Sequence, residues 1–144
     1  MGKTMRAIGL MSGTSMDGID VALIETDGEN RVDRLACLTV AYDAPFRSNL
    51  AAALTDASSL TDRSARPGCL AAVELELTRR HGSAIAQLFA QGAAGGVDVI
   101  GFHGQTVLHA PERHLTVQIG DGPALARQAG IDVVYDLRAA DVAA

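Results

Sequence analysis

Apolar residues alternate with polar or small residues in three segments near the start of the chain, and this period of two predicts β-strands. The segments are residues 6–12, 19–25 and 32–42, and the Asp27-Gly28 pair between the second and the third is a turn signal. Because short turns join strands that lie side by side, we expect the three segments to form an antiparallel meander.

Later in the chain, the apolar positions change to a spacing of three and four residues. Between residues 69 and 91 this spacing predicts a long helix with one face on a sheet, and Gly82 inside it marks an expected kink or break. The remaining predicted elements are a short helix at 47–54, a strand at 97–102 that is apolar enough to be buried on both faces, short strands at 106–108 and 115–119, a helix from 122 to 128 that ends at Gly130, and a parallel strand at 131–135.

This order of elements predicts an α/β fold. Three antiparallel strands followed by βαβ crossovers give a mixed sheet with helices on both faces, and the order matches one half of a ribonuclease-H-like unit. The 144 residues suit one domain spanning 1–144. Since no glycine cap or charged tail follows Asp141-Val142-Ala143-Ala144, we expect a truncated first domain of a longer protein.

The composition narrows the function classes. A net charge of -5 and an aromatic content of 3% argue against nucleic acid as a partner, because such binding favours a basic face and stacking side chains. The apolar runs are too short for a membrane span, and we find no signal peptide, so the expected compartment is the cytoplasm. Cys37 and Cys69 are expected to be reduced core residues.

Glycines, hydroxyls and carboxylates gather in the turn between the first two strands. Its sequence is Ser12-Gly13-Thr14-Ser15-Met16-Asp17-Gly18-Ile19-Asp20. Glycines let backbone N–H groups face an anion, hydroxyls add donors, and Asp17 and Asp20 are suited to a hydrated Mg²⁺. An ordinary solvated turn is the alternative, but the clustering favours a grip on nucleotide phosphates. Neither a P-loop motif nor the dinucleotide G-x-G-x-x-G motif occurs in the chain.

A second polar segment, His103-Gly104-Gln105-Thr106, directly follows the predicted buried strand at 97–102. Ligands of open α/β sheets bind beyond the carboxyl ends of strands, and an imidazole, an amide and a hydroxyl suit a polyhydroxylated substrate such as a sugar. A turn in which His103 caps a carbonyl is the alternative. A zinc site would need His109 and His114 as well, and their spacing fits no zinc template.

Two more turns contain side chains that could bind a ligand. In Gln118-Ile119-Gly120-Asp121-Gly122 a helix N-terminus could face an anion, although a simple N-cap by Asp121 is favoured. After the last predicted strand, Asp136 is suited to a hydroxyl or a metal and Arg138 to a carboxylate or phosphate. A surface ion pair is the alternative for this last segment.

Taken together, the polar segments resemble the anhydro-N-acetylmuramic acid kinase family of the actin-like and sugar-kinase ATPase superfamily. The resemblance covers the whole chain and rests on Gly9 to Asp20, His103 to Thr106, Thr116 to Gly120, and Asp136-Leu137-Arg138. It implies two ribonuclease-H-like domains with ATP between them. It also implies that Gly13, Thr14, Ser15, Met16, Asp17, Gly18, Ile19 and Asp20 contact the ATP phosphates, that Asp17 holds Mg²⁺ through water, and that His103, Gly104, Gln105, Thr106, Asp136 and Arg138 face the sugar.

The implied reaction uses ATP, Mg²⁺ and water to convert 1,6-anhydro-N-acetylmuramic acid to N-acetylmuramic acid 6-phosphate, a step of peptidoglycan recycling. The resemblance places the catalytic base, the adenosine contacts and a second, C-terminal domain beyond residue 144. A chain of this length is therefore expected to be inactive alone. A stand-alone nucleotide- or sugar-binding module and a histidine-dependent metallohydrolase are the alternatives, and the oligomeric state, a homodimer included, is left open.

Overall fold

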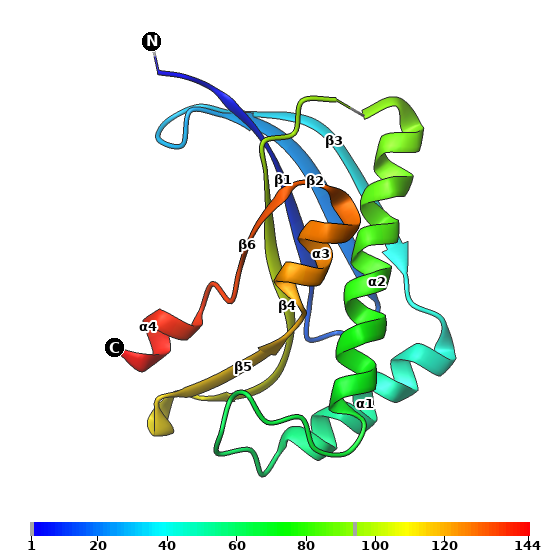
Figure 1. The fold of residues 1–144 in the computed structure, drawn as a ribbon, viewed down its shortest axis with the longest axis vertical. Helices are drawn as coiled ribbons and strands as arrows, with labels where there is room; N and C mark the ends of the chain where they lie inside the picture. The colour runs from blue at the N-terminus through cyan, green and yellow to red at the C-terminus, as the bar shows by residue number, and fades with distance from the viewer. Residues whose placement is uncertain (1, 94) are drawn as a thin grey trace.

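One six-stranded mixed sheet and four α-helices form the fold (Figure 1), and the computed structural model describes residues 2–93 and 95–144. Strands β1 (Met5–Ser12), β2 (Gly18–Thr26) and β3 (Val32–Ala41) form the predicted antiparallel meander. The alternating pattern sets the register, so that Leu10 lies opposite Val21 with both side chains buried.

Strand β4 (Val99–Ala110) lies parallel to β1 and is the branch point of the sheet. Its first half pairs in parallel with β6 (Asp132–Tyr135), and its second half pairs antiparallel with β5 (Leu115–Ile119). The predicted strands at 97–102 and 106–108 are therefore one element. The predicted break between them is a bulge, where Gly104 has a φ of 73° and the register against β1 shifts.

The first helix begins at a side-chain cap. The carboxylate of Asp43 accepts a hydrogen bond from the N–H of Phe46, so the first helix starts earlier than predicted. The predicted break at Gly82 is wrong, because the helix continues through it, and a Cβ there would meet the side chain of Gln128. The helices are α1 (Ala44–Ala57), α2 (Leu70–Leu88) with a π-turn at Phe89–Ala93, α3 (Gly122–Ala129) and α4 (Ala139–Ala143), and a 3₁₀ turn spans Pro111–Arg113.

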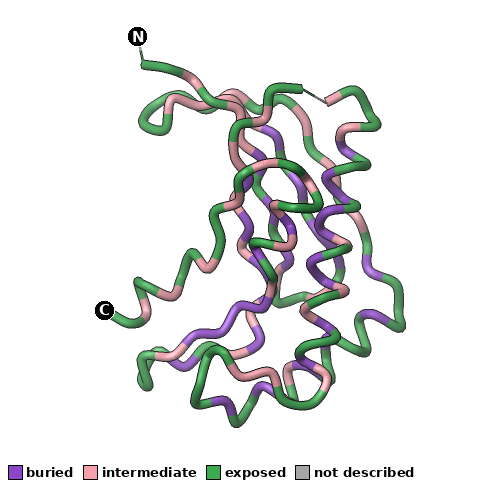
Figure 2. The backbone as a smooth tube through the Cα atoms, in the orientation of Figure 1, coloured by how far each residue is buried: buried purple, intermediate pink, exposed green. Residues whose placement is uncertain are grey.

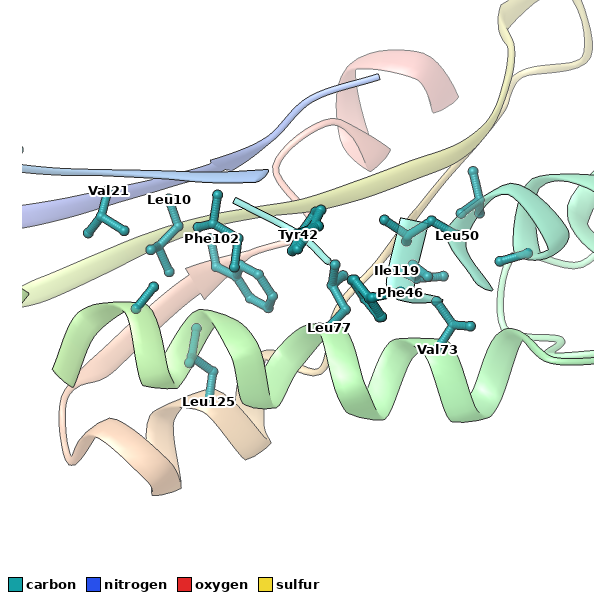
Figure 3. Packing of buried hydrophobic residues seen from close by; sticks show 14 of the residues in the cluster. Leu10, Val21, Tyr42, Phe46, Leu50, Val73, Leu77, Phe102, Ile119 and Leu125 are labelled. Atoms are coloured by element: carbon teal, nitrogen blue, oxygen red, sulfur yellow. The ribbon is translucent and has the colours of Figure 1, made fainter. Parts of the chain in front are cut away.

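The hydrophobic core lies between the sheet and the helices α1, α2 and α3. Leu10 and Phe102 from the sheet pack towards Leu77 of α2 in this layer (Figure 3), and buried stretches of backbone alternate with exposed ones along the chain (Figure 2). Helix α3 packs between α2 and β6 and contributes Leu125 to the cluster. This layer fixes the edge of the sheet on which the candidate site stands.

The opposite face of the meander is exposed to solvent. Met11, Ala22 and Cys37 point to this face and are exposed, whereas their chain neighbours face the core. Of the helices, α1, α2 and α3 share one face of the sheet, and α4 contacts β5. Because these three helices share one face, β4 alternates between buried and less buried residues instead of being buried on both faces.

Both cysteines are free thiols, but the prediction that both belong to the core is wrong for Cys37, whereas Cys69 packs against the core. Cys37 is exposed and Cys69 is half-buried at the start of α2. Each occupies a position that the apolar pattern alone does not distinguish from a core position. Among the described residues, no helix has the length and apolar character that crossing a bilayer requires.

Candidate active-site edge

Three parallel strands end at the same edge of the sheet, and each is followed by polar residues. Strand β1 leads into the turn at 13–17, β4 passes through its bulge at His103, and β6 ends at Asp136. Because β1 and β6 pair with opposite sides of β4, the turn and Asp136 flank β4 on either side. Because ligands of open α/β sheets bind outside carboxyl strand ends, this edge is the candidate site.

The first feature of the edge is the β1–β2 turn, hereafter the phosphate hairpin (residues 13–20). The N–H of Met16 donates to the carbonyl of Gly13 at 3.0 Å and closes the turn. Met16, with a φ of 54°, is the left-handed residue of this turn, and its side chain packs on the core. The expectation that the glycines supply the unusual backbone geometry is therefore corrected.

Gly18 serves a different purpose, which is close approach between strands. A Cβ at this position would lie 2.6 Å from the carbonyl oxygen of Val40, so a larger residue would push β2 away from β3. Just beyond β3, the N–H of Tyr42 donates to the carbonyl of Asp17 at 2.8 Å. These contacts tie the returning half of the hairpin to the third strand.

The exposed tip offers hydroxyls and one carboxylate. Thr14, Ser15 and Asp17 are exposed, and the hydroxyl of Ser15 donates to Asp17 at 2.8 Å. Asp20 lies within β2 rather than in the turn, where it accepts a hydrogen bond from Thr39 at 2.7 Å. Ser12 is withdrawn from the tip altogether, because its side chain is buried. The exposed tip therefore contains fewer polar side chains than the sequence pattern predicts, because Ser12 and Asp20 do not belong to it.

A hollow of about 370 Å³ separates the tip from the first turns of α1. Ser15 and Met16 line it on one side, and Arg47 and Ser48 line it on the other. Arg47 brings a positive charge beside the tip, which favours an anion there. The sequence pattern gave no reason to select Arg47, because it is one exposed position of an amphipathic helix.

The second feature is a pocket of about 200 Å³ beside the β4 bulge, hereafter the bulge pocket. His103 and Asp136 both line it, which brings two of the predicted segments together. Asp136 has a φ of 57° and accepts two hydrogen bonds, at 2.6 and 2.8 Å, from the guanidinium of Arg63. The lining residues are Arg63, Ser64, Arg66, Phe102, His103, Gly104, Gln118, Ile119, Gly120, Tyr135 and Asp136.

One side of this pocket is held by an ion pair that the sequence pattern did not reveal. Arg66 donates to both carboxylate oxygens of Glu74, at 3.1 and 3.0 Å, and Glu74 also accepts the N–H of Gly120 at 2.9 Å. Glu74 thus joins the linker before α2 to the turn after β5. The carboxylate of Asp121 accepts the N–H of Ala124 at 2.9 Å, which confirms that Asp121 caps α3.

The other residues predicted to face a sugar are placed differently. Gln105 is fully buried and does not line the pocket. Thr106 is half-buried, and its hydroxyl accepts a hydrogen bond from Gln118 at 3.1 Å. Arg138 is exposed at the start of α4. The ion pair of Asp136 is formed with Arg63, which lies outside the Asp136-Leu137-Arg138 segment.

Across residues 2–93 and 95–144, no group of three or more His, Cys, Asp and Glu side chains is arranged to hold a metal ion. His109 and His114 are exposed, near the far end of β4, whereas His103 faces the bulge pocket. His81 of α2 carries the fourth imidazole and lies in none of the motifs described above. It is buried against the ring of Phe102, and burial lowers its pKa to about 4.

Comparison with known proteins decides the family. The family model described as anhydro-N-acetylmuramic acid kinase matches residues 5–144. This chain belongs to the anhydro-N-acetylmuramic acid kinase family. Kinases of that name from Rhizobium etli and Brucella canis are 58% and 57% identical to it over 94% and 95% of this chain. The kinase from Azorhizobium caulinodans is 55% identical over 97% of this chain.

The matches to these kinases cover only part of each relative. The chain spans 37% of the length of the Rhizobium etli and Brucella canis kinases and 38% of the Azorhizobium caulinodans kinase. The membership of the family thus confirms the resemblance seen in the motifs.

Proposed function

We propose that this chain is the ribonuclease-H-like first domain of a two-domain, actin-like kinase that phosphorylates 1,6-anhydro-N-acetylmuramic acid with ATP and Mg²⁺ in the cytoplasm. The observation that carries the proposal is the placement of the phosphate hairpin and the bulge pocket on one sheet edge, in a chain of the kinase family. A second domain, contributed by the rest of the polypeptide, would close over this edge.

In this proposal the phosphate hairpin contacts the β- and γ-phosphates of ATP. The tip is exposed, is closed by the bond between Met16 and Gly13, and has Arg47 nearby. Exposed backbone N–H groups and the hydroxyls of Thr14 and Ser15 are suited to phosphate oxygens. Asp17 is the tip carboxylate, and it would hold Mg²⁺ through water, since Mg²⁺ in phosphate sites keeps much of its hydration shell.

The bulge pocket is the proposed seat of the amino sugar. N-acetylmuramic acid has hydroxyl and acetamido groups and a carboxylate, and the pocket offers matching groups in His103, Arg63 and Asp136. Arg63 uses one of its nitrogens on Asp136, which leaves further N–H groups of the guanidinium fork for a ligand carboxylate. Arg138, exposed just beyond Asp136, is the second cation that a carboxylate at this edge would meet.

The proposed chemistry is hydrolysis of the anhydro bridge joined to phosphoryl transfer. Water adds to C1 as the C1–O6 bond breaks, and O6 forms a bond to the γ-phosphorus while the bond from that phosphorus to the β-γ bridging oxygen breaks. ADP leaves, and the proton of the attacking water passes to a base from the second domain. This chain would supply positioning and charge neutralisation, which account for most of the catalysis of phosphoryl transfer.

The first test is direct binding. Calorimetric titration of the chain with Mg·ADP and with the anhydro sugar should give binding of one or both. Replacing Arg63 by Ala should weaken sugar binding about 10- to 100-fold, since a hydrogen bond to a charged group contributes about 1.5–3 kcal/mol. Arg79→Ala is the matched control, because Arg79 is exposed on α2 and pairs with Glu76 outside the pocket.

The second test is activity. A polypeptide that continues from residue 144 into the remainder of the kinase should release ADP only when the anhydro sugar is present, whereas the 144-residue chain should not. Sugar-dependent ADP release that survives Asp17→Asn and Arg63→Ala unchanged would contradict the assignment of this edge. Ligand binding by the chain, combined with no turnover by the longer polypeptide, would favour a binding module instead.

A further inference from the structure

A buried polar network connects the phosphate hairpin to strand β4. Its side chains are Ser12, Tyr42 and Gln105, which are 1%, 6% and 0% exposed. Ser12 and Gln105 face each other because the β4 bulge shifts the register and pairs the two residues across the parallel strands. Buried polar side chains are retained at little cost only when they find partners, and here each of the three does.

The direction of hydrogen-bond donation in this network follows from its geometry. Ser12 has one hydroxyl proton, and it donates to the amide oxygen of Gln105 at 2.6 Å. Tyr42 must therefore be the donor in its 2.8 Å contact with the Ser12 oxygen. Burial raises the pKa of Tyr42 to about 12, so its phenol keeps this proton at neutral pH. With its oxygen occupied, the Gln105 amide is oriented so that its nitrogen faces the hairpin.

The amide nitrogen of Gln105 then donates to the carbonyl oxygen of Gly13 at 3.1 Å. That same oxygen accepts the N–H of Met16, the bond that closes the hairpin turn. A carbonyl has two lone pairs, so both bonds form together. Gln105 thus holds the turn where it leaves β1, and the Tyr42 backbone holds it where it returns, at Asp17.

We propose that Gln105 is a positioning residue, which orients the phosphate hairpin through the Gly13 carbonyl rather than contacting the sugar. The inference rests on the proposed function for the role of the hairpin in nucleotide binding. His103, two residues earlier on the same strand, lines the bulge pocket. The His103-Gly104-Gln105-Thr106 segment therefore contributes to both sites. His103 lines the bulge pocket, and Gln105 hydrogen-bonds to the phosphate hairpin.

Hydrogen exchange of the Met16 amide in the whole chain tests the inference, because that N–H closes the turn. In Gln105→Ala, exchange at Met16 should be about fivefold faster, equivalent to about 1 kcal/mol for one hydrogen bond. Gln118→Ala is the matched control, since Gln118 is also buried and its side chain, among the described residues, hydrogen-bonds to Thr106 and Thr116 of the β4–β5 pair and not to the hairpin. It should leave exchange at Met16 at the native rate.

A second variant guards against a loss of folding. Ser12→Ala removes a single oxygen from the middle of the network and frees the Gln105 amide to rotate, so it should also accelerate Met16 exchange several-fold. Native exchange at Met16 in a folded Gln105→Ala or Ser12→Ala chain would overturn the proposal.

Ligand titrations provide the readout that a purely structural role would not move. Gln105→Ala should weaken Mg·ADP binding about fivefold and leave binding of the anhydro sugar within twofold of native. Weakened sugar binding with native Mg·ADP binding would make Gln105 a sugar contact and overturn the inference. If the native chain binds neither Mg·ADP nor the anhydro sugar, the proposed function fails by itself, and Met16 exchange still decides whether Gln105 orients the turn.

Discussion

Mild acid is expected to destabilise this fold through His81. The imidazole is 0% exposed, its ring centroid lies 4.9 Å from that of Phe102, and among the described residues it hydrogen-bonds only with the Leu77 carbonyl, at 2.7 Å. Burial lowers its pKa from 6.5 to about 4 in the folded state. As the pH falls, the unfolded chain therefore binds a proton on His81 that the folded chain does not bind. The stability that depends on a neutral His81 is fully present above pH 6.5 and is lost as the pH falls towards 4.

The size of the effect follows from the two pKa values. A shift from 6.5 to about 4 corresponds to about 3 kcal/mol in total, of which about 2 kcal/mol is lost between pH 7 and pH 5. Urea unfolding at these two pH values measures it. Carboxylates with a lowered pKa, such as Asp43 and Asp56, reduce the free energy of unfolding mainly below pH 4. The change between pH 7 and pH 5 is therefore assigned to His81.

A variant without the buried imidazole separates His81 from other groups. His81→Leu fills a similar volume and removes the Nε2 atom, which has no hydrogen-bond partner among the described residues. Its free energy of unfolding should change by less than about 1 kcal/mol between pH 7 and pH 5. His109→Gln, at an exposed site, should keep the native pH dependence. Equal losses in the native chain and in His81→Leu would refute the reasoning.

Two further predictions concern the bulge and the thiols. Gly104→Ala should destabilise the chain by about 2–4 kcal/mol in urea unfolding, because Gly104 has a φ of 73° and a Cβ would collide with the Ile119 carbonyl. Gly101→Ala on the same strand, where a Cβ would make only an ordinary van der Waals contact with the Ile8 carbonyl oxygen at 3.8 Å, should cost under about 1 kcal/mol, and equal losses would contradict the bulge. A disulfide reagent should modify exposed Cys37 before Cys69, whose pKa burial raises, and the reverse order in peptide mapping would count against this placement.

The sequence pattern correctly predicted the strands and helices that are determined by nearby residues, such as turns and caps. The β1–β2–β3 meander follows from alternation and short turns, and α3 follows from Asp121 at its start and Gly130 at its end. The boundary of α1 was missed because the cap lies at Asp43, before Pro45, and a proline in the first turn is compatible with a helix.

The candidate site was only partly predictable, because several of its contacts join distant parts of the chain. Arg63 reaches Asp136 across 73 positions, and Glu74 reaches the N–H of Gly120 across 46. A linker arginine and one carboxylate on a charged helix carry no signal of their own. Gln105 stood in a motif that the sequence associates with a ligand, yet the β4 bulge turns it towards Ser12.

Motifs and hydrophobic periods can be recognised along the chain alone, and they were enough to predict the family and most of the helices and strands. Only the tertiary structure decided that three helices share one face of the sheet, that Ser12 is buried while Thr14 and Ser15 remain exposed, and that Gln105 holds the Gly13 carbonyl. These features depend on the register between β1 and β4, and a one-residue bulge is enough to redirect every side chain beyond it.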